Sequence, residues 1–300
     1  MNAIVRDIEA APQTAGFTSR KLARFIGSEV SGLDLKAPLD TETVAALRAL
    51  LLARGVLVFR DQFLSPEQQI AFTRYFGHVN TDRPARGGAP LPGIGVFDSR
   101  NELAGRVARW HADGTHAEAP GTIKTLQPTE LPEIGGDTIW ASVEAAYDRL
   151  SPPLQRLAES LTAIHATTPL RAQDWPNGFG GEFIWSEHPV VVVHPETGRK
   201  SLFVSQRYTP EIKGVRPNES AAILKILFDH IALPEHQVRV QWAPGTIVLW
   251  DNRTSQHYAV NDYDDDLRIV HSVSVQGEPR TGVVGQKSKL GAVLKTADLV

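Results

Sequence analysis

Two short stretches of this sequence place side chains that bind metal ions close together. In Trp110-His-Ala-Asp113 an imidazole and a carboxylate stand two positions apart, and on a β-strand such positions point to the same face. They supply two of the three ligands in the set of two histidines and one carboxylate. That set binds a non-haem iron ion and leaves its other coordination positions open. His257, at the end of a second strand-like region, offers another imidazole. A lone His-x-Asp pattern is weak evidence, because most such pairs are structural or lie on the surface.

Arg268 comes eleven residues after His257, beyond an acidic turn at 262–266. A strand, a turn and a return strand would place Arg268 beside the strand that carries His257. Arginine is the side chain best shaped to bind a carboxylate through two parallel hydrogen bonds. Taken alone, however, Arg268 is better explained by an ion pair with one of the neighbouring acids, Asp264, Asp265 or Asp266.

The elements that must position these residues follow from hydrophobic spacing and turn signals. Capping residues and helical spacing predict helices over residues 40–54, 65–75, 143–164 (broken by Pro152 and Pro153) and 218–231. Apolar runs bounded by turns predict strands over residues 56–59, 188–194, 201–204, 238–242, 246–250 and 267–275. Short strands at this frequency favour an antiparallel sandwich or barrel over a doubly wound sheet. A glycine-rich phosphate loop is absent from the sequence, which disfavours a nucleotide cofactor.

Composition limits the class of protein further. The 300 residues are 42% hydrophobic and contain no cysteine, so disulfides, thiolate metal sites and cysteine nucleophiles are excluded. The net charge is −3, and acidic and basic residues are interspersed along the sequence, so the sequence shows no basic patch of the kind that binds nucleic acid. The first residues lack the apolar region of a signal peptide, and the apolar runs are far shorter than a membrane span, so we expect a cytoplasmic protein without a membrane partner. The expected organisation is a loose arm at 1–16, one domain at 17–277 and a partly packed tail at 278–300.

Several segments together resemble the taurine dioxygenase/2,4-dichlorophenoxyacetate dioxygenase (TauD/TfdA) family of Fe(II)- and 2-oxoglutarate-dependent dioxygenases. The resemblance extends from about residue 23 to residue 277. The segments that carry it, in the family's order, are 27–35, 58–61, 76–77, 110–113, 135–138, 194–200, 250–253 and 257–259. It implies a jelly roll, the cupin-like double-stranded β-helix, which is mostly β with flanking helices. It also implies a small-molecule substrate, consumption of O2, release of succinate and CO2, and a homo-dimer or homo-tetramer.

The resemblance also assigns roles to individual residues. His111, Asp113 and His257 match the Fe(II) ligands and thus the catalytic centre. Arg268 matches the residue that binds the distal carboxylate of 2-oxoglutarate, with Thr138 as its hydrogen-bonding partner. A buried dianion needs such a fixed cation and a hydroxyl donor. Because related halogenases replace the carboxylate ligand by a small residue, Asp113 implies hydroxylation of an aliphatic carbon.

The sequence departs from the family at the substrate end of the site. Members that use sulfonates or sulfates carry a second arginine four residues after the cosubstrate arginine, and here that position is Ser272. Strand alternation places Ser272 on the face of Arg268 and Val270, with His271 opposite. Other expected pocket residues are Asn80, Asp82, Val107, His116 and Tyr208. These residue types predict a neutral or amine-bearing substrate and a protein that is not specific for sulfonates.

Alternatives stay open at this stage. An alkyl sulfate, a sulfonate or an aryloxyalkanoate would fit if another cation, such as Arg83 or Arg86, entered the pocket. A hydrolase with zinc on the same His/Asp/His set is another class, because zinc accepts these ligands, but it leaves Arg268 and Thr138 without a purpose. A non-catalytic jelly roll that binds a small ligand is a third. Consumption of 2-oxoglutarate in the presence of iron distinguishes the dioxygenase from both.

Overall fold

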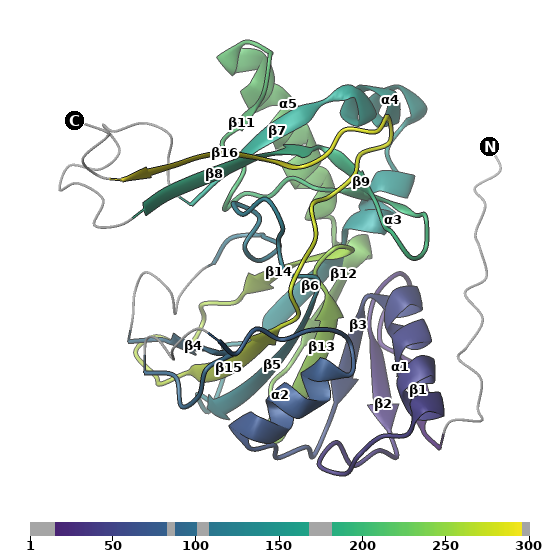
Figure 1. The fold of residues 1–300 in the computed structure, drawn as a ribbon, viewed down its shortest axis with the longest axis vertical. Helices are drawn as coiled ribbons and strands as arrows, with labels where there is room; N and C mark the ends of the chain where they lie inside the picture. Colours follow the sequence, from purple (N-terminus) through teal and green to yellow (C-terminus); the bar gives the residue numbers. More distant parts are fainter. Residues whose placement is uncertain (1–15, 83–87, 101–107, 168–181, 296–300) are drawn as a thin grey trace.

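A computed structural model of the chain shows two β-layers that face each other, with a third sheet at one end (Figure 1). The structure describes residues 16–82, 88–100, 108–167 and 182–295. The arm predicted at 1–16 therefore lies outside the described residues except for Gly16. Among the described helices, none is long and apolar enough to cross a membrane.

The larger layer is a seven-stranded sheet. Its strands, in spatial order, are β1 (Thr18–Lys21), β2 (Ser28–Ser31), β3 (Val56–Phe59), β13 (Ile247–Asp251), β5 (Ile123–Glu130), β15 (Ile269–Ser274) and β4 (Ile94–Asp98). Among the strands that the structure describes, β2 and β3 are the one parallel pair. The strands predicted at 56–59, 246–250 and 267–275 are confirmed as β3, β13 and β15 within one or two residues at most ends.

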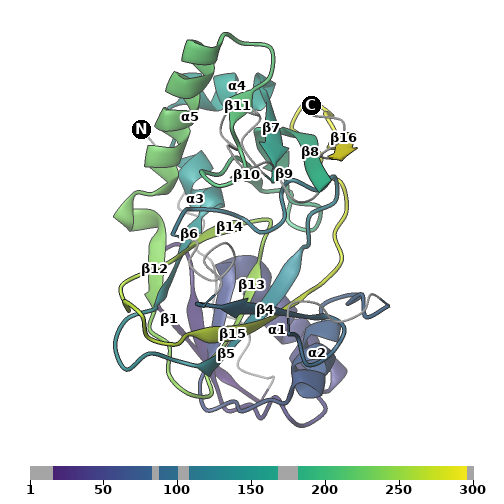
Figure 2. The same cartoon turned by 90° about the vertical axis from the view of Figure 1, so that its left-hand side faces the viewer.

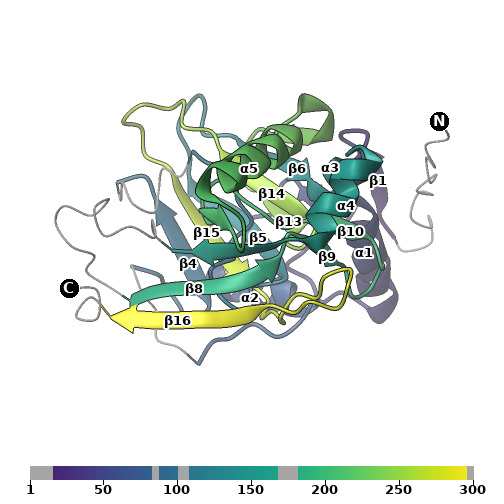
Figure 3. The same cartoon turned by 90° about the horizontal axis from the view of Figure 1, so that it is seen from above.

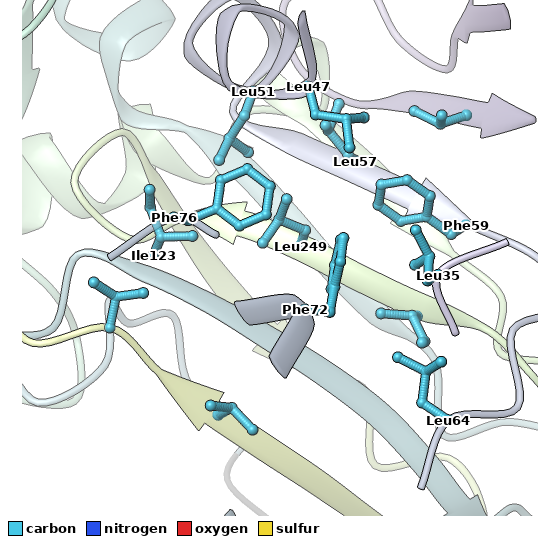
Figure 4. Close-up of a cluster of buried hydrophobic side chains, with 14 of the residues drawn as sticks. Leu35, Leu47, Leu51, Leu57, Phe59, Leu64, Phe72, Phe76, Ile123 and Leu249 are labelled. Atoms are coloured by element: carbon cyan, nitrogen blue, oxygen red, sulfur yellow. The ribbon is translucent and has the colours of Figure 1, made fainter. Parts of the chain in front are cut away.

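Two helices cover the outer face of this sheet, α1 (Thr41–Arg54) and α2 (Pro66–Arg74). Asp40 caps α1 by accepting from the backbone N–H of Thr43 at 2.7 Å. A capping box of Ser65 and Gln68, followed by proline at the first position, starts α2. Figure 4 shows the resulting core, in which Leu51 and Phe72 lie against the sheet.

The smaller layer is a three-stranded sheet that faces the inner side of the large one. Its strands, in spatial order, are β12 (Gln237–Val240), β6 (Thr138–Ser142) and β14 (Ser255–Ala259). Side chains of both layers share one buried cluster, in which the rings of Trp140 and Trp250 lie 5.9 Å apart. This is the predicted jelly roll.

A third layer lies at the end of the molecule opposite α1 and α2 (Figures 1 and 2). A four-stranded sheet contains, in spatial order, β11 (Glu211–Ile212), β7 (Thr162–Ala166), β8 (Glu182–Pro189) and β16 (Lys289–Lys295). A hairpin and four helical segments surround it: β9 (Val191–Val193), β10 (Lys200–Leu202), α3 (Val143–Asp148), α4 (Pro152–Ser160), α5 (Pro217–Ile231) and the 3-10 turn η2 (Pro234–His236).

Two predicted elements differ from the structure. The helix expected over 143–164 gives way to strand β7 at Thr162, because 162–166 pairs with both β8 and β11 and buries Ala163 and His165 completely. The strand expected over 188–194 divides between β8 and β9, since the backbone N–H of Val190 turns away to donate to Leu161 at 3.0 Å.

The end of the chain packs against the third layer. Residues 278–300 were expected to pack only in part, and they contribute β16, which pairs with β8 and lies alongside it in Figure 3. Arg280 is 6% exposed and donates to the carbonyls of Pro120 and Gly121 at 2.8 and 3.2 Å. Arg280 therefore connects the segment that precedes β16 to the loop that follows the His-x-Asp motif.

Candidate functional site

His111 and His257 are joined through their backbones. Each donates its N–H to the carbonyl of the other, at 3.0 and 2.8 Å, and their ring centroids lie 4.2 Å apart. His257 belongs to β14, whereas His111 forms only an isolated bridge to it. Two histidines that are 146 positions apart in the sequence thus become neighbours on one small sheet edge.

Asp113 reaches the two imidazoles from a turn. The strand geometry invoked for His111 and Asp113 does not extend beyond His111, because the chain turns at Asp113 and Gly114 takes a left-handed φ of 68°. Asn252 fixes the turn, since its amide accepts from Asp113 N at 2.9 Å and donates to Asp113 O at 3.0 Å. The carboxylate therefore faces the imidazoles through a turn and not through strand alternation.

The three side chains form a compact donor group. Asp113 Oδ1 lies 3.4 Å from His111 Nε2 and 3.8 Å from His257 Nε2, and one ligand atom from each residue lies within 4.8 Å of the others. His111 Nδ1 contacts the carbonyl of Arg109 at 2.7 Å. That contact assigns the proton to Nδ1 and leaves Nε2 to act as a metal ligand.

Burial sets the charge of this group. The His257 ring is stacked on Trp140 and meets Trp250 edge-on, with ring centroids at 6.2 and 5.5 Å. Burial lowers the pKa of His257 to about 3. Burial would raise the pKa of Asp113, but the positive charge of Lys124, together with interactions with His257 and His111, holds it well below its usual range. At neutral pH the group thus offers a neutral imidazole at His257 and a carboxylate at Asp113, which are forms that bind divalent metals.

Lys124 was missed by the sequence analysis. It lies on β5, directly opposite Trp250 on β13, and its ammonium pairs with Asp113 Oδ2. The side chain is only 11% exposed. The available signal was a lysine at the start of a run, Ile123 to Gln127, that is otherwise uncharged and predicts a buried strand.

Arg268 and Thr138 also come together, although by another route than expected. Arg268 precedes β15 in the large sheet, whereas His257 lies in the small sheet, so the two are not on neighbouring strands as predicted. Arg268 reaches across the interior to donate to Gly136 O at 2.9 Å and to Thr138 Oγ1 at 3.4 Å. The bonds recorded for its guanidinium among the described residues involve no carboxylate, which overturns the surface ion pair with the acidic turn.

Two consecutive glycines allow the chain to pass close to Arg268 and to Asp262. Gly136 has φ 68°, and a Cβ there would lie 3.0 Å from Arg268 Cδ. At Gly135, with φ 87°, a Cβ would lie 2.4 Å from the carbonyl oxygen of Asp262. Both positions therefore need glycine. Burial lowers the pKa of Arg268, although the nearby charge of Asp137, which pairs with Arg239, opposes this. Arg268 remains a cation, and no described carboxylate forms an ion pair with it.

The expected pocket residues divide into two groups. Tyr208 lies 6.0 Å from His111 between ring centroids, and His116 lies 5.5 Å from Tyr208. Ser272 is buried and pairs with Leu126 on the inner face of the large sheet, while His271 is only half-buried.

Other expected pocket residues are not brought to the donor group. Asn80 and Asp82 are exposed, and Asn80 Oδ1 accepts from the backbone of Asp82 at 3.0 Å. Val107, together with Arg83 and Arg86, lies outside the described residues. A further cation, Arg207, was missed: its guanidinium lies 5.1 Å from the ring centroid of Tyr208, on the chain segment that follows β10.

Comparison with known proteins assigns the chain to a family. The model of the taurine catabolism dioxygenase TauD, TfdA family matches residues 18–274. The chain is 37% identical to an alkylsulfatase of Acinetobacter baylyi, over 90% of this chain and 88% of that protein. It is 33% identical to an alpha-ketoglutarate-dependent sulfate ester dioxygenase of Pseudomonas putida, over 94% and 97% of the two chains.

The solved structures agree. A taurine dioxygenase from Burkholderia xenovorans superposes with a TM-score of 0.82 at 34% identity, over 94% of this chain and 97% of that chain. These matches favour the predicted dioxygenase over a zinc hydrolase or a non-catalytic jelly roll. The buried donor group and an arginine that forms no ion pair with a described carboxylate fit the Fe(II) and the 2-oxoglutarate that such enzymes use. This chain belongs to the TauD/TfdA family and is a dioxygenase that depends on Fe(II) and 2-oxoglutarate.

Proposed function

We propose that His111, Asp113 and His257 hold Fe(II), and that the enzyme hydroxylates an aliphatic carbon of a small organic substrate. The observation that carries the proposal is the convergence of two imidazole nitrogens and one carboxylate oxygen within 4.8 Å. Two histidines and a carboxylate leave adjacent positions open for a cosubstrate and O2. Bound Fe(II) supplies the chemistry in which O2 is consumed while 2-oxoglutarate is converted to succinate and CO2.

Arg268 and Thr138 bind the distal carboxylate of 2-oxoglutarate in this proposal. The Arg268 guanidinium uses Nε on Gly136 O and Nη2 on Thr138, and its remaining N–H groups can meet a carboxylate. Thr138 Oγ1 already accepts from Trp242 Nε1 at 3.0 Å. The Thr138 hydroxyl hydrogen is therefore available to donate to the same carboxylate.

Ser272 supports a substrate other than a sulfonate or sulfate. It lies on the inner face of the large sheet, where sulfonate-using relatives would place their second arginine according to the family resemblance. A neutral hydroxyl contributes about 0.5–1.5 kcal/mol per hydrogen bond, against roughly 1.5–3 kcal/mol for a bond to a charged group. A sulfate would lose its main partner at this position, so we propose a neutral or amine-bearing substrate.

Arg207 favours one second candidate. Its guanidinium lies over the Tyr208 ring at 5.1 Å, and Tyr208 in turn lies beside His111. A cation at this place can bind the anionic end of an alkyl sulfate, a sulfonate or an aryloxyalkanoate. The relatives from Acinetobacter and Pseudomonas are named for sulfate esters, which belong to that class of substrate.

The experiment is a substrate panel in which succinate release is measured with Fe(II), 2-oxoglutarate and O2. Neutral aliphatics and amino acids are compared with taurine, an alkyl sulfate and an aryloxyalkanoate. Turnover that is fastest with a neutral or amine-bearing compound supports the proposal. Fast turnover of a sulfate or sulfonate contradicts it, and the variant Arg207→Met then tests the second candidate. Arg207 binds the substrate anion if this variant raises the KM for that substrate and leaves the KM for 2-oxoglutarate unchanged.

A further inference from the structure

A buried lysine lies directly beside the proposed Fe(II) ligands. Lys124 points into the space between the two layers from β5, and it stands opposite Trp250 on β13 and Ser274 on β15. Its ammonium lies 5.8 Å from the centroid of the Trp250 ring. Removing an ammonium from water is costly unless an anion faces it. Here that anion is the side chain of Asp113.

The two oxygens of Asp113 have different partners. Oδ2 accepts from Lys124 Nζ, whereas Oδ1 faces His111 Nε2 at 3.4 Å and His257 Nε2 at 3.8 Å. The backbone of Asp113 is fixed on both sides by Asn252. With its backbone fixed and one oxygen engaged, the carboxylate has one oxygen left to direct at a metal ion.

The different partners of the two Asp113 oxygens affect how many coordination positions remain open on a bound metal ion. A carboxylate that binds through both oxygens takes two positions, and 2-oxoglutarate needs two adjacent ones for its keto acid while O2 needs another. We propose that Lys124 is a positioning residue that keeps Asp113 a one-oxygen ligand and so preserves the position that 2-oxoglutarate occupies. The inference rests on the proposed Fe(II) site. It assigns Lys124 a function in cosubstrate binding and not in metal affinity.

The test separates these two affinities without turnover. Binding of Mn(II) alone, and then of 2-oxoglutarate to the Mn(II)-loaded protein, is measured by calorimetry for the wild type, Lys124→Met and Lys124→Arg. Lys200→Met is the matched control, because Lys200 also pairs with a carboxylate, Glu159 at 2.7 Å, but lies on β10 away from the donor group. The visible spectrum of the Co(II)-loaded proteins reports the number of ligands independently.

In Lys124→Met we expect Mn(II) affinity to stay equal or to rise, because both oxygens of Asp113 can then bind. We expect the 2-oxoglutarate affinity to fall by about tenfold or more, within the range found for residues that orient metal ligands. The Co(II) spectrum should shift toward a higher ligand number. Lys124→Arg, which keeps a cationic donor, should restore most of the 2-oxoglutarate affinity, and Lys200→Met should match the wild type throughout.

Two results would overturn the inference. One is an unchanged 2-oxoglutarate affinity in Lys124→Met. The other is a loss of Mn(II) affinity that parallels the loss of 2-oxoglutarate, which would make Lys124 a support for metal binding itself. If Lys124→Met does not fold, Lys124→Gln offers one neutral donor to Oδ2 and should give an intermediate affinity for 2-oxoglutarate.

Failure of the proposed function has a different signature. If Asp113→Ala binds Mn(II) as tightly as the wild type, the metal site itself is misassigned. If Asp113→Ala loses Mn(II) while Lys124→Met keeps full 2-oxoglutarate affinity, only the function assigned to Lys124 is wrong.

Discussion

Asp113 and Asn252 are joined by two reciprocal hydrogen bonds, from Asp113 N to Asn252 Oδ1 at 2.9 Å and from Asn252 Nδ2 to Asp113 O at 3.0 Å. Asn252 directly follows β13 and is almost fully buried. The pair ties the turn that carries one proposed metal ligand to the large sheet. The position of Asp113 therefore depends on a residue that is not itself one of the three proposed metal ligands.

Replacing Asn252 by alanine should loosen this turn. We expect Asn252→Ala to weaken Mn(II) binding by about tenfold, since residues that orient metal ligands have effects of this size. The unsatisfied Asp113 backbone should also lower the free energy of unfolding by about 1–3 kcal/mol. Calorimetry and urea unfolding measure the two effects. Wild-type Mn(II) affinity in a folded variant would show that the turn holds its shape without Asn252.

The three proposed metal ligands should be individually required. His111→Ala, Asp113→Ala and His257→Ala should each lower Mn(II) affinity by more than the roughly 100-fold upper range of indirect effects, because a direct ligand is lost. His230→Ala is the control, since His230 lies on α5, where its Nε2 contacts Ala146 O at 2.9 Å, and is not part of the donor group. Retained binding in all three variants would remove the metal assignment.

Arg268 should control cosubstrate affinity. Arg268→Ala removes the cation from a buried carboxylate, a loss of about 3–5 kcal/mol, so the dissociation constant of 2-oxoglutarate should rise by about 100-fold or more. Lysine at this position should rescue only part of the affinity, because it lacks the planar fork. Titration of Mn(II)-loaded proteins with 2-oxoglutarate measures both. A dissociation constant for the alanine variant equal to that of the wild type would contradict the assignment.

His188 should make the metal-free protein less stable in acid. Its ring is fully buried between Thr115 O at 2.7 Å and Ser288 Oγ at 2.6 Å, and burial lowers its pKa to about 4 from 6.5. The unfolded chain takes up a proton below pH 6.5, whereas the folded chain resists protonation until about pH 4. This histidine's stabilising contribution is thus complete above pH 6.5 and is lost as the pH falls to 4, by about 3 kcal/mol.

Urea unfolding of the wild type and His188→Gln at several pH values checks this. The free energy of unfolding of the variant should fall less steeply between pH 6.5 and pH 4 than that of the wild type. Equal slopes would mean that the folded chain protonates His188 as readily as the unfolded one.

Local signals predicted those parts of the fold that depend on local chemistry. Asp40 and Ser65 mark the helix starts because their side chains cap the first turn. Strand β7 was missed because its conformation depends on pairing with β8 and β11, which are distant in sequence. Where tertiary pairing decides the conformation, periodicity within one segment carries too little information.

The candidate site shows the same division. The His-x-Asp pattern alone was weak evidence, and the family resemblance added His257 as the third ligand; the structure brings the three side chains together. The way in which the backbone brings His111 next to His257 was not predictable, because the two residues pair through a single β-bridge between segments that are distant in sequence. Lys124 was overlooked for a related reason: a lysine in an otherwise uncharged run predicts no function until the opposing carboxylate is known.

A crystal structure of the protein with Mn(II) and the unreactive analogue N-oxalylglycine tests the central claim most directly. The account predicts anomalous density for one Mn(II) bound by His111 Nε2, Asp113 Oδ1 and His257 Nε2, with the distal carboxylate of the analogue on Arg268 and Thr138. Metal density at any other donor group, or a distal carboxylate bound away from Arg268, would contradict it.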